Sequence, residues 1–222
     1  LAEAPGAAAA GGGYPAAGAA GPRALDRAAL EALLRCTFVS HLLFERERDF
    51  AARALWAFPP PVSPARPFGA VPSSSDVGCE AMLCAGDFLY ERVCVRQVGV
   101  VNGINIGLGL FVTDFVARGT IFGEYTGCVR LRGGDEDLSD DYGYALPMVD
   151  PDLVVSAMNY GNLCRLINHS DDVWNAELLP VHHEGVIHVV CRCVRDLEAG
   201  EQVLIHYGNK YWEVSRRRKA NL

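Results

Sequence analysis

Two patterns of apolar and polar positions divide this chain. In the first, between Leu25 and about Trp56, apolar residues recur at helical spacing among Arg and Glu, at Leu25, Ala29, Leu33, Val39, Leu42 and Leu43. This spacing is typical of amphipathic helices. We therefore expect one or two helices over residues 24–58, forming a small element of their own.

The second pattern predicts strands. From residue 89 onward, short runs of Val, Ile, Leu and Tyr are separated by Gly and Asp, as in YERVCVRQVGVV, GLFVTDF, GTIFGEYTG, GVIHVVCRCV and EQVLIHYG. No helical pattern regularly separates these runs and no internal repeat is present, which argues against a parallel doubly wound sheet. The sequence predicts a mostly β fold with minor α content over residues 89–208.

Composition marks the remaining segments. Residues 1–23 are almost all Ala, Gly and Pro, a composition typical of a flexible tail. Residues 59–88 are rich in Pro and Ser and predict a connector. The last segment, residues 209–222, carries Tyr211, Trp212 and the basic run RRRK. This run is more typical of a solvated helix end than of a targeting signal.

Charge and cysteine use narrow the classes of partner. The formal net charge of −7 argues against a general nucleic-acid-binding protein and suits a basic protein partner. The eight cysteines are scattered through a chain too long to need disulfides, which favours a reducing, intracellular compartment. They also lack paired C-x-x-C spacing, which argues against a structural zinc site. Cys191 and Cys193 alternate along an expected strand and should share one face. No apolar run approaches the ~20 residues of a membrane span, no signal peptide is recognisable, and the start at Leu1 suits a piece excised from a longer protein.

Two segments concentrate residues suited to a ligand site. Gly107 and Gly109 flank Leu108 in NIGLGLFV, where glycine lets a backbone approach a ligand but also makes a turn or a bulge. Residues 157–170 read AMNYGNLCRLINHS, a run too polar for a core strand unless each group has a partner, and GEQVLIHYG follows at residues 200–208. Such a density of polar groups indicates either a site or a hydrogen-bonded corner between strands.

Together these motifs resemble the SET-domain lysine methyltransferases. YGNLCRLINHS is similar to the family signature YGN-x-x-RF-x-NHS, and NIGLGLFV to its first G-x-G motif. GEYTGCV, DYGYAL and GEQVLIHYG resemble its second strand motif, its Y-x-F-x-L strand and its closing G-E-E-L-x-x-D-Y-G motif, in the family's order. The resemblance implies a SET fold of small β-sheets with a C-terminal pseudoknot, in which the NHS segment lies beside the closing tyrosine.

The resemblance also implies a cofactor, S-adenosylmethionine (SAM), which becomes S-adenosylhomocysteine. Position by position, the cofactor-binding residues would be Ile106, Gly107, Leu108, Gly109, Glu124, Tyr125, Arg165, Asn168, His169, Tyr207 and Trp212. Catalysis would rest on Tyr142, Tyr160 and Tyr207, with Tyr207 closest to the transferred methyl group. The lysine channel would be formed by Tyr142, Tyr160, Ile205, Tyr211 and Trp212.

These residue types suit methyl transfer to lysine. The reaction is an in-line displacement by a neutral amine, whereas free lysine has a pKa of about 10.4, so the site must favour the deprotonated amine. Tyrosines provide an apolar wall and a hydroxyl that can hold the amine in line. Taken singly, each tyrosine would more often be a packed strand residue.

The chain departs from the family pattern at several positions. Asp171 replaces a frequent Cys after NHS, and His206 replaces the usual Asp before the closing tyrosine. Ile205 stands where many relatives carry Phe or Tyr and where bulk helps to limit the number of methyl groups, so the degree of methylation is open. No cysteine cluster precedes Gly107 or follows Trp212. We expect a compact member of bacterial or viral type without zinc-bound flanking modules, with residues 25–56 in part of the flanking role.

Charge and family together give the expected substrate. An acidic stretch precedes the expected strand of the DYGYAL motif and contains Asp135, Glu136, Asp137, Asp140 and Asp141. It is either a solvated loop or a region that attracts a basic peptide, which would lie beside this strand. We expect a protein-lysine N-methyltransferase that acts on a basic tail, with histone favoured. A methyltransferase of another basic protein and a catalytically silent SET-shaped binding module are the alternatives. A histone substrate would imply a role in chromatin regulation and a place of action in a nucleus. That nucleus could be the nucleus of a host cell that the protein reaches by secretion. We expect neither nucleic acid nor membrane as a direct partner.

Overall fold

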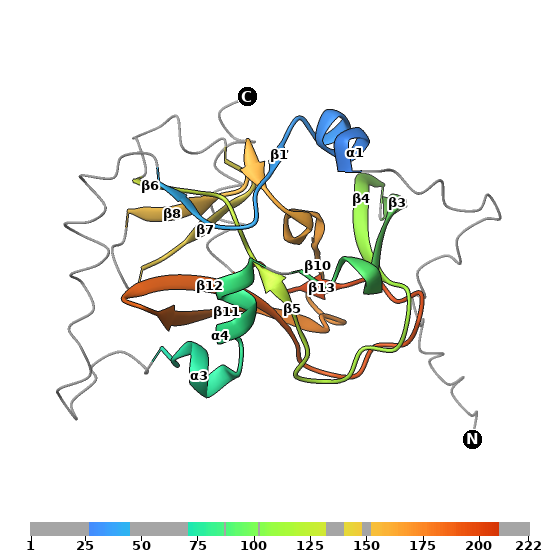
Figure 1. Ribbon diagram of the computed structural model, residues 1–222. Helices are drawn as coiled ribbons and strands as arrows, with labels where there is room; N and C mark the ends of the chain where they lie inside the picture. Colours follow the sequence, from blue (N-terminus) through green and yellow to red (C-terminus); the bar gives the residue numbers. More distant parts are fainter. Residues whose placement is uncertain are drawn as a thin grey trace, which may run out of the picture.

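The computed structural model describes residues 27–44, 71–86, 88–101, 103–131, 140–147 and 152–208. Over these residues the chain is mostly strands in small sheets, as the sequence predicts (Figure 1). The helical elements are α1 (Arg27–Leu34), α3 (Ser74–Val77), α4 (Glu80–Ala85), η1 (Tyr90–Arg92) and η3 (Leu163–Leu166). The strands are β1 (Thr37–Phe38), β2 (Leu43–Phe44), β3 (Val93–Val101), β4 (Ile104–Val112), β5 (Ile121–Glu124), β6 (Cys128–Leu131), β7 (Gly143–Ala145), β8 (Leu153–Ser156), β9 (Tyr160–Gly161), β10 (Asn168–His169), β11 (Ala176–His183), β12 (Val186–Cys193) and β13 (Leu204–Ile205). No helix among the described residues is long and apolar enough to cross a bilayer.

Strands β3 and β4 form an antiparallel hairpin. The register shifts on both sides of Gly99, whose φ of 83° is open to glycine and rare for other residues. Toward its end β4 alternates between the two faces of the hairpin, so that Leu110 and Val112 are fully buried. This alternation leaves Gly109 and Phe111 on the opposite face.

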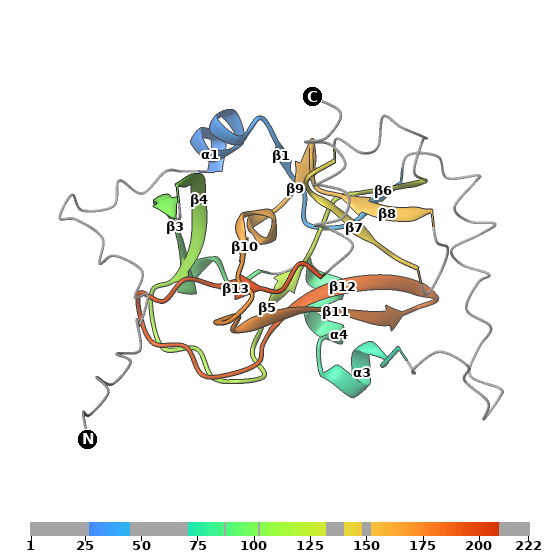
Figure 2. The same ribbon diagram turned by 180° about the vertical axis from the view of Figure 1, so that it is seen from behind.

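Two larger sheets carry the core. One has the strand order β11-β12-β5 and the other β2-β6-β8-β7, and both views show them in separate layers (Figures 1 and 2). Phe122, Val155 and Val189 from these sheets belong to one hydrophobic cluster. Cys191 and Cys193 are both buried, which confirms that they share a face, and burial raises the pKa of the Cys193 thiol to about 12.

The N-terminal element differs from the sequence prediction. α1 is helical as expected, but residues 37–38 and 43–44 are strands that pair in parallel with β9 and β6. The helix holds its strand in place, because the Glu31 carboxylate accepts from the Phe38 N–H at 2.7 Å. The expectation of a separate element is therefore wrong for residues 37–44, since tertiary strand pairing overrides a weak local helical pattern.

The expected Pro/Ser-rich connector also contains ordered structure. Ser73 caps α3 in a capping box with Asp76, and Gly86 ends α4 in the left-handed conformation. The two helices pack on the β11-β12-β5 sheet through a cluster of Cys79, Leu83, Val181 and Val190. Residues 71–86 thus belong to the folded body rather than to a linker.

The last described segment passes between two parts of the fold. Val203 N–H donates to the Leu110 carbonyl of β4 at 2.8 Å, and Ser170 N–H donates to the Ile205 carbonyl at 3.0 Å. β13 pairs in parallel with β10, which sets Asn168 and His169 beside Leu204 and Ile205. This is the threading that the resemblance implies for the C-terminal pseudoknot.

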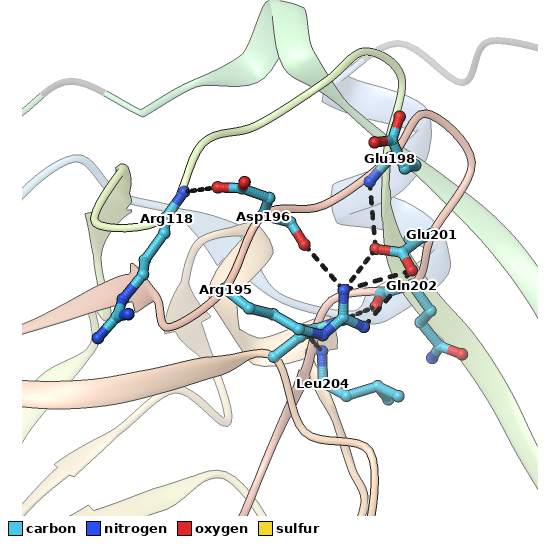
Figure 3. Close-up of polar contacts among 8 residues, drawn as sticks. Arg118, Arg195, Asp196, Glu198, Glu201, Gln202 and Leu204 are labelled. Carbon is cyan, nitrogen blue, oxygen red and sulfur yellow. Dashed lines mark hydrogen bonds and ion pairs between the residues drawn. The ribbon is translucent and has the colours of Figure 1, made fainter.

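A braced turn precedes this segment. Arg195 donates to the Glu201 carboxylate at 2.9 Å and to the Asp196 carbonyl at 2.8 Å (Figure 3). The Asp196 carboxylate accepts in turn from the Arg118 N–H at 2.7 Å. Because these contacts fix both ends of the turn, the direction in which Gln202 and the following residues leave it is fixed as well.

Candidate functional site

Asn168 ties the glycine motif to the polar segment. Its Nδ2 donates to the Leu108 carbonyl at 3.0 Å. A Cβ on Gly109 would lie 3.0 Å from Asn168 Nδ2 and 2.5 Å from Gln202 Nε2, so Gly109 is required for these side chains to approach β4. Gly107, with φ of 77°, faces open space instead. Of the two glycines, only Gly107 leaves the backbone beside the half-buried Ile106 open to a ligand.

The polar run folds into a short helix that one of its own side chains caps. Asn162 caps η3 by accepting from the Cys164 N–H at 3.0 Å, and its Nδ2 donates to the Glu124 carbonyl at 2.6 Å. This cap directs Arg165 inward, and Arg165 is only 7% exposed. The Arg165 guanidinium lies 4.1 Å from the centre of the Tyr142 ring, a cation–π contact.

Tyr207 lies against the NHS segment. Its hydroxyl donates to the Ile167 carbonyl at 2.8 Å, and its peptide N–H donates to His169 Nδ1 at 3.1 Å. The His169 and Tyr207 rings are 5.2 Å apart. The parallel pairing of β10 with β13 therefore brings together three predicted site residues, Asn168, His169 and Tyr207.

Tyr125 and Tyr142 form the next part of the same cluster. The buried Tyr125 hydroxyl donates to the Tyr142 carbonyl at 2.7 Å. Burial raises the pKa of Tyr125 well above its usual range, and the neighbouring Tyr207 raises it further. Tyr125 is therefore a neutral donor that fixes the backbone at Tyr142.

Glu124 points away from this cluster. Its buried carboxylate contacts His188 Nδ1 at 2.6 Å, on the side of β5 opposite to Tyr125, because neighbouring residues of an extended chain face opposite ways. Only the Glu124 carbonyl takes part in the site, as acceptor for Asn162. The prediction that both side chains line one pocket does not fit this geometry.

The other predicted channel residues differ in their surroundings, and two of them cannot be placed. Tyr160 on β9 is 42% exposed, and among the described residues no hydrogen bond or ring contact joins it to Tyr142 or Tyr207. Ile205 is buried in the hydrophobic core. Tyr211 and Trp212 lie outside the described residues.

Asp140 gives the acidic stretch a structural role at one position. Its carboxylate pairs with Arg130 at 2.9 Å and accepts from the Tyr142 N–H at 3.0 Å. These contacts anchor the start of β7 and with it Tyr142. Asp135, Glu136 and Asp137 lie outside the described residues.

Sequence reasoning missed two residues that complete the site. Asn175 donates to the Gln202 carbonyl at 2.8 Å and accepts from the Leu204 N–H at 2.8 Å, which locks the segment leading to Tyr207. Gln202 points from this segment toward the β3–β4 hairpin (Figure 3). Asn175 stands where the family pattern after NHS resumes, which was the available signal, whereas Gln202 carried none.

Unused hydrogen-bond donors remain around this cluster. Within the described part of the chain, the Nε atoms of Arg96 and Arg165 and the Nε2 of Gln202 are buried and have no hydrogen-bond partner. Buried donors without partners are costly, and a ligand rich in acceptor oxygens or nitrogens would satisfy them. A metal site has no support here, since no three His, Cys, Asp or Glu side chains in the described ranges form a group suited to a metal ion.

Comparisons with known proteins match this architecture. Residues 107–208 match the family model of the SET domain. Curated relatives include the histone-lysine N-methyltransferase EZH2 of Chaetomium thermophilum, 28% identical over 126 residues, and histone-lysine N-methyltransferase 2B of Homo sapiens, 32% identical over 123 residues. These alignments cover 50% and 53% of this chain but only 8% and 4% of the relatives.

A solved structure agrees on the fold. The ATXR5 SET domain, in complex with histone H3 di-methylated on R26, has a TM-score of 0.60 and 20% identity, and the match covers 82% of this chain and 85% of that chain. At this identity the likeness concerns the fold alone. Family model, relatives and fold agree, and we conclude that residues 107–208 of this chain are a SET domain related to those of the SET-domain lysine methyltransferases.

Proposed function

We propose that this chain is a SAM-dependent protein-lysine N-methyltransferase that acts on a basic protein tail, with histone as the favoured substrate. The observation that carries the proposal is the joining of Tyr207, Asn168 and the β4 backbone through hydrogen bonds within a SET domain. Three buried donors beside this cluster, on Arg96, Arg165 and Gln202, have no partner among the described residues, and a bound ligand would supply acceptors for them.

Tyr207 is proposed as the catalytic tyrosine. Its hydroxyl and its peptide N–H are both held, by the Ile167 carbonyl and by His169. Because the side chain needs no rearrangement, it can keep a lysine amine in line for attack, and such positioning is worth several kcal/mol.

Tyr142 and Arg165 are proposed to favour the neutral amine. The Arg165 guanidinium over the Tyr142 ring places a fixed positive charge beside the proposed channel. A neighbouring positive charge and an apolar wall both lower the pKa of an amine, so less of the lysine is protonated. Tyr160, which is exposed, is proposed to contact the incoming substrate at the channel mouth, and Ile205, Tyr211 and Trp212 keep their proposed roles as channel walls.

The proposed cofactor pocket is revised in one position. When bound, SAM supplies a methyl group on a positively charged sulfur. Ile106 to Gly109, Tyr125, Arg165, Asn168, His169, Tyr207 and Trp212 are proposed to hold it, whereas the Glu124 side chain is left out because it is committed to His188.

One observation favours a histone tail over other basic proteins, and a second fits any basic tail. The two curated relatives are both histone-lysine methyltransferases. The chain also carries a net charge of −7, which suits a substrate rich in Lys and Arg. A histone substrate implies a nuclear or chromatin-associated place of action.

The test is transfer of a radiolabelled methyl group from SAM by the full chain to core histones and, separately, to a whole-cell lysate. Tyr207→Phe is the control, since it keeps the ring and removes only the hydroxyl. We expect label on histone lysines with wild type and a near-background signal with Tyr207→Phe. Label in the lysate alone would move the substrate to another basic protein. SAM binding without transfer to either pool would favour the catalytically silent binding module, and absence of both would refute the proposed function.

A further inference from the structure

Asp171 and His206 form a bridge beside Tyr207. Asp171 Oδ1 lies 3.0 Å from His169 Nε2 and 3.5 Å from His206 Nε2. The two imidazole rings meet edge to face at 5.2 Å. One carboxylate oxygen therefore serves two histidines, one before and one after the segment that crosses between β4 and β10.

The contacts fix the tautomer of His169. The peptide N–H of Tyr207 can only donate, so His169 Nδ1 must accept and carry no proton. The proton of the neutral ring is then on Nε2, where it donates to Asp171. Asp171 thus selects the tautomer that Tyr207 requires.

His206 repeats this arrangement on the other side of Tyr207. Its Nδ1 accepts from the Gly208 N–H at 3.0 Å, so its own proton is on Nε2, facing Asp171. The peptide N–H groups of Tyr207 and of the next residue, Gly208, are thus both held by imidazole nitrogens. Both imidazoles also contact Asp171.

We propose that Asp171 and His206 are a coupled pair of positioning residues for Tyr207, an inference that rests on the proposed function. Both stand where the SET pattern usually has other residues, Cys and Asp. An Asp at position 206 could still accept from the Gly208 N–H, but it would set a second carboxylate beside Asp171. With an imidazole at position 206, the Asp171 carboxylate faces no second carboxylate. The pair can then orient His169 and Tyr207.

The bridge acts on geometry rather than on stability. The Asp171 side chain is 73% exposed, and ion pairs in such positions add little to folding. Orientation of a reacting group is far more sensitive, because a small misplacement lowers a rate by one or two orders of magnitude. The pair should therefore affect kcat more than the melting temperature.

The kinetic test compares variants of the full chain. Asp171→Ala should lower kcat by about tenfold with the KM for SAM within about twofold, while Asp171→Asn, which keeps the acceptor oxygen, should restore most of the rate. Asp172→Asn, an exposed neighbour, is the matched control. His206→Asp should lower kcat by about tenfold in the wild-type background and by less than about threefold alongside Asp171→Asn, because the like charges are then gone.

A spectroscopic test separates this inference from the proposed function. In protein labelled with nitrogen-15 in histidine, His169 should show an unprotonated Nδ1 and a protonated Nε2, and Asp171→Ala should weaken this preference, because the Tyr207 N–H is then the only one of the two contacts that favours it. If wild type transfers no methyl group, the proposed function fails and the histidine signals alone decide the positioning role. Equal kcat values and equal histidine signals in Asp171→Ala and Asp172→Asn would overturn the inference.

Discussion

Buried polar side chains find their hydrogen-bond partners in different ways on the two sides of β5. On one side, Glu124 and His188 form a closed side-chain pair at 2.6 Å. On the other, Tyr125, Asn168 and Tyr207 donate to backbone carbonyls. In the part of the chain that the structure describes, the buried donors without partners, on Arg96, Arg165 and Gln202, lie near the second group. A closed pair stabilises a fold, whereas side chains anchored on backbone beside unused donors are prepared for a ligand.

Breaking the anchor on the ligand side should have the larger effect. Asn168→Ala removes the tie to the Leu108 carbonyl and opens space beside Gly109. We expect the Kd for SAM to rise by about tenfold and the free energy of unfolding to fall by about 1–3 kcal/mol. Calorimetric titration with SAM and urea unfolding of the same preparations measure the two changes. An unchanged Kd would remove Asn168 from the proposed pocket.

Breaking the closed pair should affect stability alone. Glu124→Gln keeps the shape of the side chain but replaces a charge-assisted hydrogen bond to His188 with a neutral one. We expect the free energy of unfolding to fall by about 1–2 kcal/mol and the Kd for SAM to stay within about twofold. A tenfold weaker binding of SAM with unchanged stability would mean that the Glu124 carboxylate belongs to the cofactor pocket. It would also contradict the proposed difference between the two sides of β5.

A pH series sharpens the comparison at Tyr125. The pKa of this buried hydroxyl is raised in the folded chain, so tyrosine binds its proton more tightly folded than unfolded. The resulting stability is complete below the unfolded pKa of about 10 and is lost as the pH rises through the folded pKa. Tyr125→Phe should cost about 1 kcal/mol at neutral pH, from the lost bond to Tyr142.

Urea unfolding between about pH 7 and pH 11 tests this sign. The gap between wild type and Tyr125→Phe should close as the pH rises above about 10, because only wild type loses stability there through this group. Tyr90→Phe gives a graded comparison, since Tyr90 is 50% exposed and burial raises its pKa less than that of Tyr125, so its gap should change in the same direction by less. A gap that widens with pH would contradict the assignment of a buried neutral donor.

The sequence predicted the site motifs better than the elements that support them. NHS, the closing tyrosine and the glycines could be recognised because a SET domain needs them at fixed places in the chain, and the β-rich fold followed from short apolar runs. The direction of Glu124 could have been predicted as well, because Glu124 and Tyr125 are neighbours on an extended segment. The strands at residues 37–38 and 43–44 could not, since each is two residues long and is stabilised by partners far along the chain.

Other features of the chain depend on tertiary packing in the same way. The helices at residues 74–85 follow a Pro/Ser-rich stretch and are stabilised by packing on β11 and β12. Gln202 gives no sequence signal, because its role depends on which face of β4 it meets. The boundaries of the tail at residue 23 and of the C-terminal segment at residue 209, the likeness to compact bacterial or viral members and the roles of Tyr211 and Trp212 stay predictions.

The most direct test of the central claim separates binding from chemistry at Tyr207. SAM binding by calorimetry and methyl transfer to core histones should be measured on wild type and Tyr207→Phe in parallel. We predict a Kd for SAM within about threefold of wild type and a kcat at least about 100-fold lower, because the hydroxyl positions the reacting amine and contributes little to holding the cofactor. Transfer by Tyr207→Phe at the wild-type rate would contradict the account.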